Sequence, residues 1–155
     1  MHDMTDISGV WRPFEQLSSR EVHDLLKLRQ DIFVVEQDCA YPDIDGLDLE
    51  ALHYFLKENA TNRLVGALRL FEAGAADEAA RLGRVVIDPD YRGRKLGHKL
   101  MQAGIERARS LRPECQIFVT AQAHLLRFYA DFGFVAISEI YPQDGIPHLD
   151  MRKSV

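Results

Sequence analysis

Glycines and cations concentrate in one short segment, residues 92–97, although the whole chain carries a formal net charge of −5. The candidate site consists of Arg92, Gly93, Arg94, Lys95, Leu96 and Gly97. It follows the apolar run Val85, Val86 and Ile87 and precedes a helical pattern, and a strand that turns directly into a helix leaves the first N–H groups of that helix without partners. Those donors and the helix dipole favour an anion, and glycine lets a ligand approach the main chain closely. The segment therefore predicts a phosphate site made mostly of backbone donors.

Neither standard nucleotide-binding motif fits this segment. The ATP-type loop requires a lysine directly after its second glycine and then serine or threonine, whereas Lys99 comes two residues after Gly97 and is followed by Leu100. The dinucleotide pattern G-x-G-x-x-G is absent as well. A solvated basic helix start, with glycines that serve only the turn, is the alternative interpretation.

The elements that must hold this site can be predicted from the hydrophobic pattern. Ser18 and Glu21 form a capping box at the start of a helix, and Gly133 favours the end of another. We expect strands at 10–14, 52–57, 64–71, 82–87, 117–121, 135–141 and 148–152, and helices at 18–35, 95–111 and 124–132. Residues 74–80 form a loop, and 142–147 a turn. Strands and helices that alternate in this way predict one α/β (α+β) sheet domain over residues 1–155.

Composition limits the class of protein. With 155 residues, 46% hydrophobic and 28% charged, the chain is expected to be a single soluble domain. No apolar run approaches the roughly 18 residues of a membrane span, and the N-terminus lacks a signal-peptide pattern, so we expect a cytoplasmic protein without membrane partners. Cys39 and Cys115 are too few for a disulfide scaffold, and no set of residues has zinc spacing. The net negative charge argues against nucleic acid as a partner.

Two segments resemble the GNAT acetyltransferases. "VVIDPDYRGRKLG" resembles that family's acyl-coenzyme A signature, [QR]-x-x-G-x-[GA]: Arg92 and Gly97 match its outer positions, and Lys95 replaces the usual middle glycine. "AHLLRFYADFGFV" resembles the family's A-x-x-F-Y-x-x-x-G-F segment. The likeness covers nearly the whole chain, and three segments resemble the ElaA-like branch: "LRQDIFVVEQDCAYPDIDGLD", "AQAHLLRFY" and "DGIPHLDM".

This resemblance implies a fold and a reaction. The fold would be a mixed, mostly antiparallel sheet that splays between its fourth and fifth strands and is flanked by helices. Val85, Val86 and Ile87 would pair with the pantetheine arm of acetyl-CoA, and residues 92–97 would hold its pyrophosphate. The implied function is N-acetyltransferase: the acetyl group moves to a primary amine of a small molecule or peptide by direct attack in a ternary complex, without a metal. The alternative is a non-catalytic acyl-CoA-binding or sensing module on the same fold.

Acetyl transfer to an amine needs a base, an oxyanion donor and a proton for the leaving thiolate. Tyr129 matches the general acid of the family and is our candidate for the proton donor. Many family members carry an acid on the fourth strand, where this chain has "RLGR" at 81–84. We therefore select Glu36 and His53 as the catalytic base pair. His124, His148 or a chain of water molecules are the alternatives.

The region 38–50 is irregular and acidic, with Asp38, Asp43, Asp45, Asp48 and Glu50. It is either a solvated loop or a surface that attracts a cationic amine substrate. A homodimer is compatible with the sequence, which names neither the acceptor nor the oligomeric state.

Overall fold

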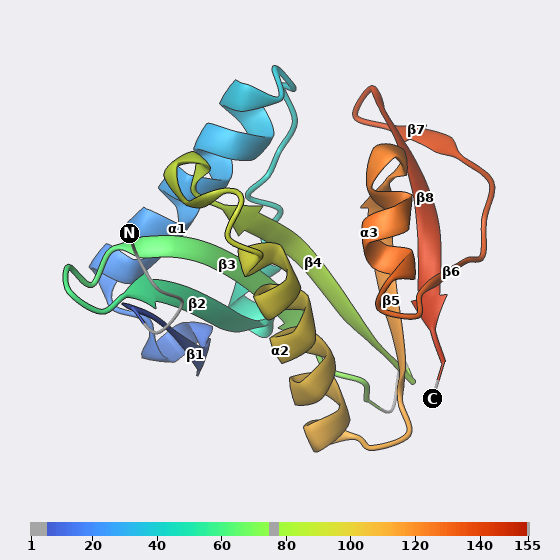
Figure 1. Cartoon of the computed structure of the whole chain (residues 1–155), viewed down its shortest axis with the longest axis horizontal. Helices are drawn as coiled ribbons and strands as arrows, with labels where there is room; N and C mark the ends of the chain where they lie inside the picture. Colours follow the sequence, from blue (N-terminus) through green and yellow to red (C-terminus); the bar gives the residue numbers. More distant parts are fainter. Residues whose placement is uncertain (1–5, 75–77, 155) are drawn as a thin grey trace.

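The computed structural model describes residues 6–74 and 78–154, which form one eight-stranded sheet flanked by helices (Figure 1). The strands are β1 (Ile7–Pro13), β2 (Leu52–Glu58), β3 (Leu64–Phe71), β4 (Ala79–Ile87), β5 (Gln116–Gln122), β6 (Val135–Ala136), β7 (Tyr141–Gln143) and β8 (Ile146–Lys153). Their order is β1-β2-β3-β4-β5-β8-β6, and β7 also pairs with β8. Every recorded pair is antiparallel except β4 with β5. The predicted fold class, a mixed and mostly antiparallel sheet in one domain, is confirmed.

Helices α1 (Ser19–Arg29) and α2 (Leu96–Leu111) cover opposite faces of the sheet, and the short α3 (Leu126–Ala130) lies beside β5 and β8 (Figure 1). The α1 face buries Leu25 and Leu28 against Phe55 and Val86. The larger core lies under α2 and joins both halves of the sheet; it includes Leu56, Leu70, Leu82, Leu100, Met101, Ile117 and Met151. Gly104 lets α2 approach the sheet closely, because a Cβ there would lie 2.8 Å from Leu68 Cδ2 and 3.0 Å from Leu82 Cδ1.

The sheet opens between β4 and β5. These parallel strands pair only at Ala79–Gln116, Ala80–Ile117 and Arg81–Phe118, and beyond those pairs they diverge (Figure 1). A bulge bends β4 at this point. Ala67 of β3 pairs with Val86, and Arg69 pairs with Gly83, so β4 has one more residue than β3 between these two pairs. The predicted splay between the fourth and fifth strands is confirmed.

Two predicted helices differ in detail. The helix expected at 18–35 begins with the predicted capping box, in which Ser18 Oγ accepts from the Glu21 N–H at 3.1 Å and the Glu21 carboxylate accepts from the Ser18 N–H at 3.0 Å. It then continues as a π-helix, Gln30–Glu36, in which each backbone N–H bonds to the carbonyl five residues earlier. The helix expected at 124–132 is shorter, with a 3-10 turn at Ala123–Leu125 followed by α3.

The strand predicted at 135–141 is wrong in its middle, because only β6 and the start of β7 are strands. The Asp150 N–H donates to Ser138 Oγ at 2.9 Å, so a side chain takes the place of a backbone ladder partner. The loop expected at 74–80 ends earlier, since β4 begins at Ala79, and positions 75–77 lie outside the described residues. No helix in 6–74 or 78–154 is long and apolar enough to cross a bilayer.

Candidate functional site

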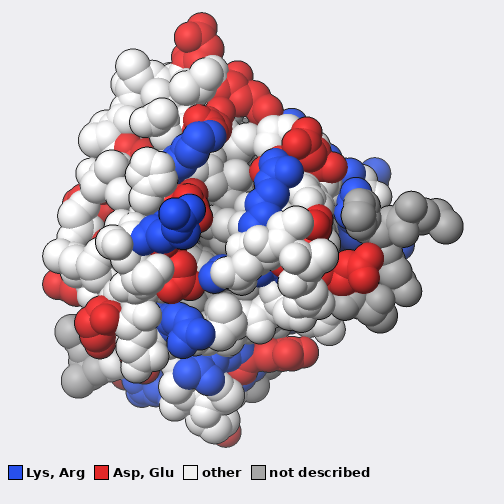
Figure 2. All heavy atoms as spheres, turned by 90° about the vertical axis from the view of Figure 1, so that its left-hand side faces the viewer, with Lys and Arg blue, Asp and Glu red and all other residues white. Residues whose placement is uncertain are grey.

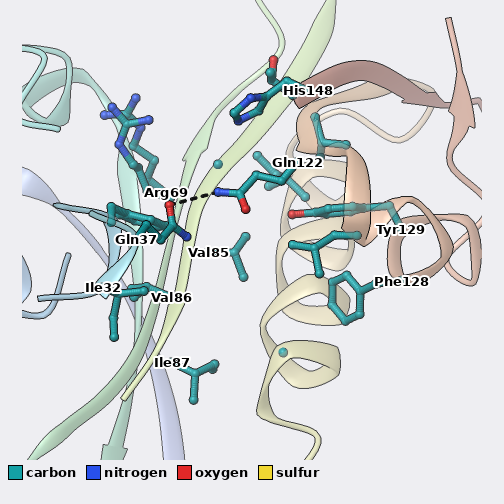
Figure 3. Close-up of a pocket in the computed structure, with 18 of the residues that line it drawn as sticks. Ile32, Gln37, Arg69, Val85, Val86, Ile87, Gln122, Phe128, Tyr129 and His148 are labelled. Carbon is teal, nitrogen blue, oxygen red and sulfur yellow. Dashed lines mark hydrogen bonds between the residues drawn. The ribbon is translucent and has the colours of Figure 1, made fainter. Parts of the chain in front are cut away.

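A cavity of about 860 Å³ occupies the opening between β4 and β5 (Figure 3). Val85, Val86 and Ile87 line one side, and Val119 and Tyr129 line the other. Because β4 has no strand partner toward β5 beyond Arg81, its backbone edge faces this space. Such an edge can pair with an extended, amide-bearing chain.

The turn 92–97 closes one end of the cavity and presents free backbone donors. Gly93 and Lys95 both adopt left-handed backbone conformations, with φ of +82° and +58°. The N–H of Lys99 makes the first backbone bond of α2, to the Lys95 carbonyl at 3.2 Å. Within the described part of the chain, no acceptor is found for the N–H groups of residues 93–97. The donors that the sequence predicted are therefore not capped internally.

The side chains of this segment have different surroundings. Gly93, Lys95, Leu96 and Gly97 line the cavity together with Arg92. The Arg92 side chain forms an ion pair with Glu36, and its N–H bonds to the Pro89 carbonyl at 3.4 Å. Arg94 does not line the cavity and instead lies over the Tyr91 ring, 4.8 Å from its centroid.

Lys95 marks the departure from the family pattern. It is the N-cap of α2 with φ +58° and ψ +27°, a conformation in which a side chain costs about 1–2 kcal/mol relative to glycine. The backbone thus adopts here a conformation that favours glycine although the residue is lysine.

Tyr129 is buried, with 8% of its surface exposed, and its hydroxyl points into the cavity (Figure 3). No hydrogen bond of this hydroxyl is found among the described residues. The ring packs edge-on against Phe128 and Phe134, at centroid distances of 5.1 and 6.1 Å. Burial raises the pKa of Tyr129 to about 12, so the phenol keeps its proton at neutral pH. It can therefore act as a hydrogen-bond donor toward a group in the cavity.

The structure does not bring together the proposed base pair, and neither residue lines the cavity. His53 is 1% exposed, and its Nε2 lies 2.8 Å from the Asp48 carbonyl oxygen. Burial lowers the pKa of His53, although the contact with Asp48 opposes this effect. Glu36 lies at the surface in its ion pair with Arg92. A base role for this pair has no geometric support.

Three acids of the acidic region form ion pairs with arginines, whereas Asp38 and Glu50 are exposed. Asp43 and Asp48 are buried and pair with Arg29, at 2.9 and 2.7 Å. Asp45 pairs with Arg69 at 2.6 Å, and that hydrogen bond holds the pKa of the Asp45 carboxyl well below its usual range. Burial opposes ionisation of Asp48, but hydrogen bonds from its arginine partners outweigh burial and lower its pKa. We refer to residues 38–50 as the acidic segment.

Arg84 adds a third cation to the acidic segment. It occupies a left-handed conformation in the β4 bulge, with φ +52°, and its Nε lies 2.9 Å from Asp43 Oδ1. Figure 2 shows the face on the left of Figure 1, where positive and negative side chains are interspersed. That face carries no broad field of a single sign.

Two contacts cross the cavity at the end away from the turn 92–97, and the sequence did not predict them. Gln122 Nε2 donates to Gln37 Oε1 at 3.2 Å (Figure 3), and Cys39 Sγ lies 3.0 Å from the Asp144 carbonyl oxygen. Both pairs line the cavity. Their only signal in the sequence is that all four residues fall in segments that resemble the ElaA-like branch: Gln37 and Cys39 in "EQDC", Gln122 in "AQAHLLRFY" and Asp144 in "DGIPH".

A family model described as "Acetyltransferase (GNAT) domain" matches residues 33–155. The chain belongs to the GNAT acetyltransferase family. It is 38% identical to the ElaA protein of Escherichia coli over 140 residues, which are 90% of this chain and 92% of that protein. It is also 38% identical to a UPF0039 protein of Schizosaccharomyces pombe over 150 residues, 96% and 98% of the two chains. These relatives support the ElaA-like branch.

Solved structures agree with this GNAT assignment. A crystal structure of an acyl-CoA N-acyltransferase from Pseudomonas aeruginosa has a TM-score of 0.89 and 36% identity, covering 96% of this chain and 99% of that one. The crystal structure of E. coli ElaA has a TM-score of 0.87 at 36% identity, with the same coverage. The GNAT chain is thus an acyltransferase by family and fold, for which acyl-CoA is the expected co-substrate.

The residues present fit that co-substrate. The free N–H groups of residues 93–97 suit a pyrophosphate, and the unpaired edge of β4 suits the amides of pantetheine. Among the residues that the structure describes, no cluster of histidine, cysteine and acidic side chains could hold a metal ion.

Proposed function

We propose that this protein transfers the acetyl group of acetyl-CoA to a primary amine of a small molecule or peptide, by direct attack in a ternary complex. One observation carries the proposal. The opening between β4 and β5 has free backbone donors at one end and, along its wall, a Tyr129 hydroxyl without a partner in the described chain.

The backbone supplies the binding of the donor substrate. The N–H groups of the turn 92–97 would hold the pyrophosphate, and Val85, Val86 and Ile87 would pair with the pantetheine amides. The bulge turns β4 just before these residues, so that a backbone N–H on this edge can stabilise the oxyanion. Such donors need no reorganisation during the reaction.

Tyr129 would deliver a proton to the leaving thiolate. Its pKa of about 12 keeps it protonated at neutral pH, and its hydroxyl projects into the cavity (Figure 3). A positioned acid of this kind contributes about 10²–10⁴-fold to a rate.

The test is a thiol-release assay with acetyl-CoA and a panel of amines. Tyr129→Phe should lower kcat about 100-fold and leave the Kd for coenzyme A unchanged, because only the proton is lost. The matched control is Tyr141→Phe: the Tyr141 hydroxyl bonds to Asp150 at 2.5 Å, and its side chain does not line the cavity. A Tyr129→Phe variant with wild-type turnover would reject the role of Tyr129.

A sensing module is the second candidate, favoured by the absence of Glu36 and His53 from the cavity lining. Such a protein would bind coenzyme A in isothermal titration but release no thiol with any amine. Transfer to even one amine of the panel decides for the enzyme.

A further inference from the structure

His148 lies where β8 borders the cavity, at the end away from the turn 92–97. Its backbone is fixed from both sides, because it pairs with Gln122 of β5 and with Tyr141 of β7. The side chain is partly buried and lines the cavity, into which it projects (Figure 3). The strand pairing therefore holds this imidazole in a defined place on the acceptor side.

The hydrogen bond of this ring determines its tautomer. His148 Nδ1 lies 2.7 Å from the Ile146 carbonyl oxygen, and a carbonyl oxygen can only accept. Nδ1 must therefore carry the hydrogen. In the neutral ring the lone pair is then on Nε2, for which no hydrogen bond is found in the described part of the chain.

The other described imidazoles lack this combination. His53 is buried and its Nε2 already contacts a carbonyl oxygen, and His98 packs against Phe128 and Phe132 outside the cavity lining. His23 is an exposed residue of α1. His124 lines the cavity, but it is exposed and no recorded hydrogen bond orients its ring.

We propose that His148 is the general base that prepares the acceptor amine. The inference rests on the proposed acetyl transfer. Nε2 takes a proton from the acceptor ammonium and later releases it to solvent, which leaves an amine lone pair that attacks the thioester carbonyl. The C–N bond forms, the C–S bond breaks, and the thiolate takes the Tyr129 proton. The second proton of the amine nitrogen restores the tyrosine through solvent, so the ammonium yields an amide, a thiol and one free proton.

The groups around His148 leave this role open. Gln122 and Thr120 of β5 are neutral, and the Tyr141 hydroxyl of β7 is bonded to Asp150 of β8. The other titratable side chains that line the cavity near His148 are His124 in the turn after β5, Asp144 in the β7–β8 turn, Cys39 and Tyr41 opposite it, and the Asp45, Arg69 and Arg84 group. The charges of that last group are already paired with one another.

The test compares His148→Ala with wild type against two classes of acceptor. For an alkyl amine, which is charged at neutral pH, we expect kcat/KM to fall roughly 100-fold. For an aromatic amine or hydroxylamine, which is already neutral, the loss should be less than about tenfold. The Kd for coenzyme A should not change, and added imidazole should restore part of the rate.

The controls separate this role from a structural one. His23→Ala, at an exposed position of α1, should keep the wild-type rates with both classes of amine. His148→Gln keeps a polar side chain of similar size without a base, and it serves if the alanine variant does not fold. Equal losses with both classes of amine, or no rescue by added imidazole, overturn the base role of His148 while the acetyltransferase proposal stands. A wild-type protein that transfers to no amine overturns both.

Discussion

The acidic segment and the turn 92–97 are both rich in charge, but the structure treats their polar groups in opposite ways. In the acidic segment, Asp43, Asp45 and Asp48 are each matched by arginines from other elements. In the turn, the backbone donors of residues 93–97 have no acceptor within the described chain. The ion pairs of the acidic segment hold it against the sheet, whereas the N–H groups of the turn remain available for a ligand.

The difference shows that charge composition alone does not identify a binding site. A buried carboxylate must be paired, because removing a charge from water without compensation is expensive. The acidic segment therefore lines the cavity through Cys39, Tyr41 and Asp45 in a fixed shape. Free N–H groups at the start of a helix can bond to water, so they cost little free energy without a protein partner. They therefore stay available to bind an anion.

The largest expected effect comes from breaking the pairing inside the acidic segment. Arg29→Met removes a guanidinium that is 1% exposed and leaves Asp43 and Asp48 each without one partner. We expect the free energy of unfolding, measured by urea titration, to fall by about 3–5 kcal/mol. Arg20→Met, at an exposed position of the same helix, is the matched control and should change it by less than about 0.5 kcal/mol. A similar, small change in both variants would show that the ion pairs do not fix the segment.

A smaller effect is expected when a negative side chain is placed beside the free N–H groups of the turn, where it would compete with the pyrophosphate. Gly97→Asp places a carboxylate in the first turn of α2, where a Cβ meets Phe128 Cζ at an ordinary 3.4 Å. The helix dipole favours that charge, so the melting temperature should not fall, whereas the Kd for coenzyme A should rise at least about tenfold. Gly97→Asn controls for size, since it lacks the charge. Equal affinity in the aspartate variant and wild type would show that the pyrophosphate binds elsewhere.

The smallest expected change in stability is at Lys95, whose backbone conformation belongs to the turn. Lys95→Gly removes the cost of a left-handed conformation, which stabilises the folded state by about 1–2 kcal/mol. Glycine also raises the entropy of the unfolded chain, which destabilises the folded state by about 0.4–1 kcal/mol. The net expectation is a gain of about 0.5 kcal/mol in the free energy of unfolding. Arg94→Gly, one position earlier and without a positive φ, should instead destabilise the protein. If both glycine variants lose stability, Lys95 is not strained.

The sequence predicted the turn and its neighbours well because their signals are local. Arg92, Gly97 and Tyr129 sit at fixed spacings from an apolar strand and from Gly133, and these spacings determine where they lie. The same holds for the capping box of α1, whose two residues are three positions apart.

The end of the cavity away from the turn 92–97 could not be predicted because its contacts join residues that are distant in the chain. The π-helical stretch adds a residue per hydrogen-bonded turn, so a helical repeat of 3.6 misplaces Glu36 at its end. The arginines that neutralise the acidic segment come from separate elements of the fold. No spacing in the sequence predicts that these residues will be in contact.

The two contacts that cross the cavity join residues 85 and 105 positions apart, Gln37 with Gln122 and Cys39 with Asp144. On the ribosome, every residue of the turn 92–97 is made well before Asp144 emerges. The turn that we propose holds coenzyme A is thus made early, whereas the opposite end of the cavity can be completed only when the last hairpin has been synthesised.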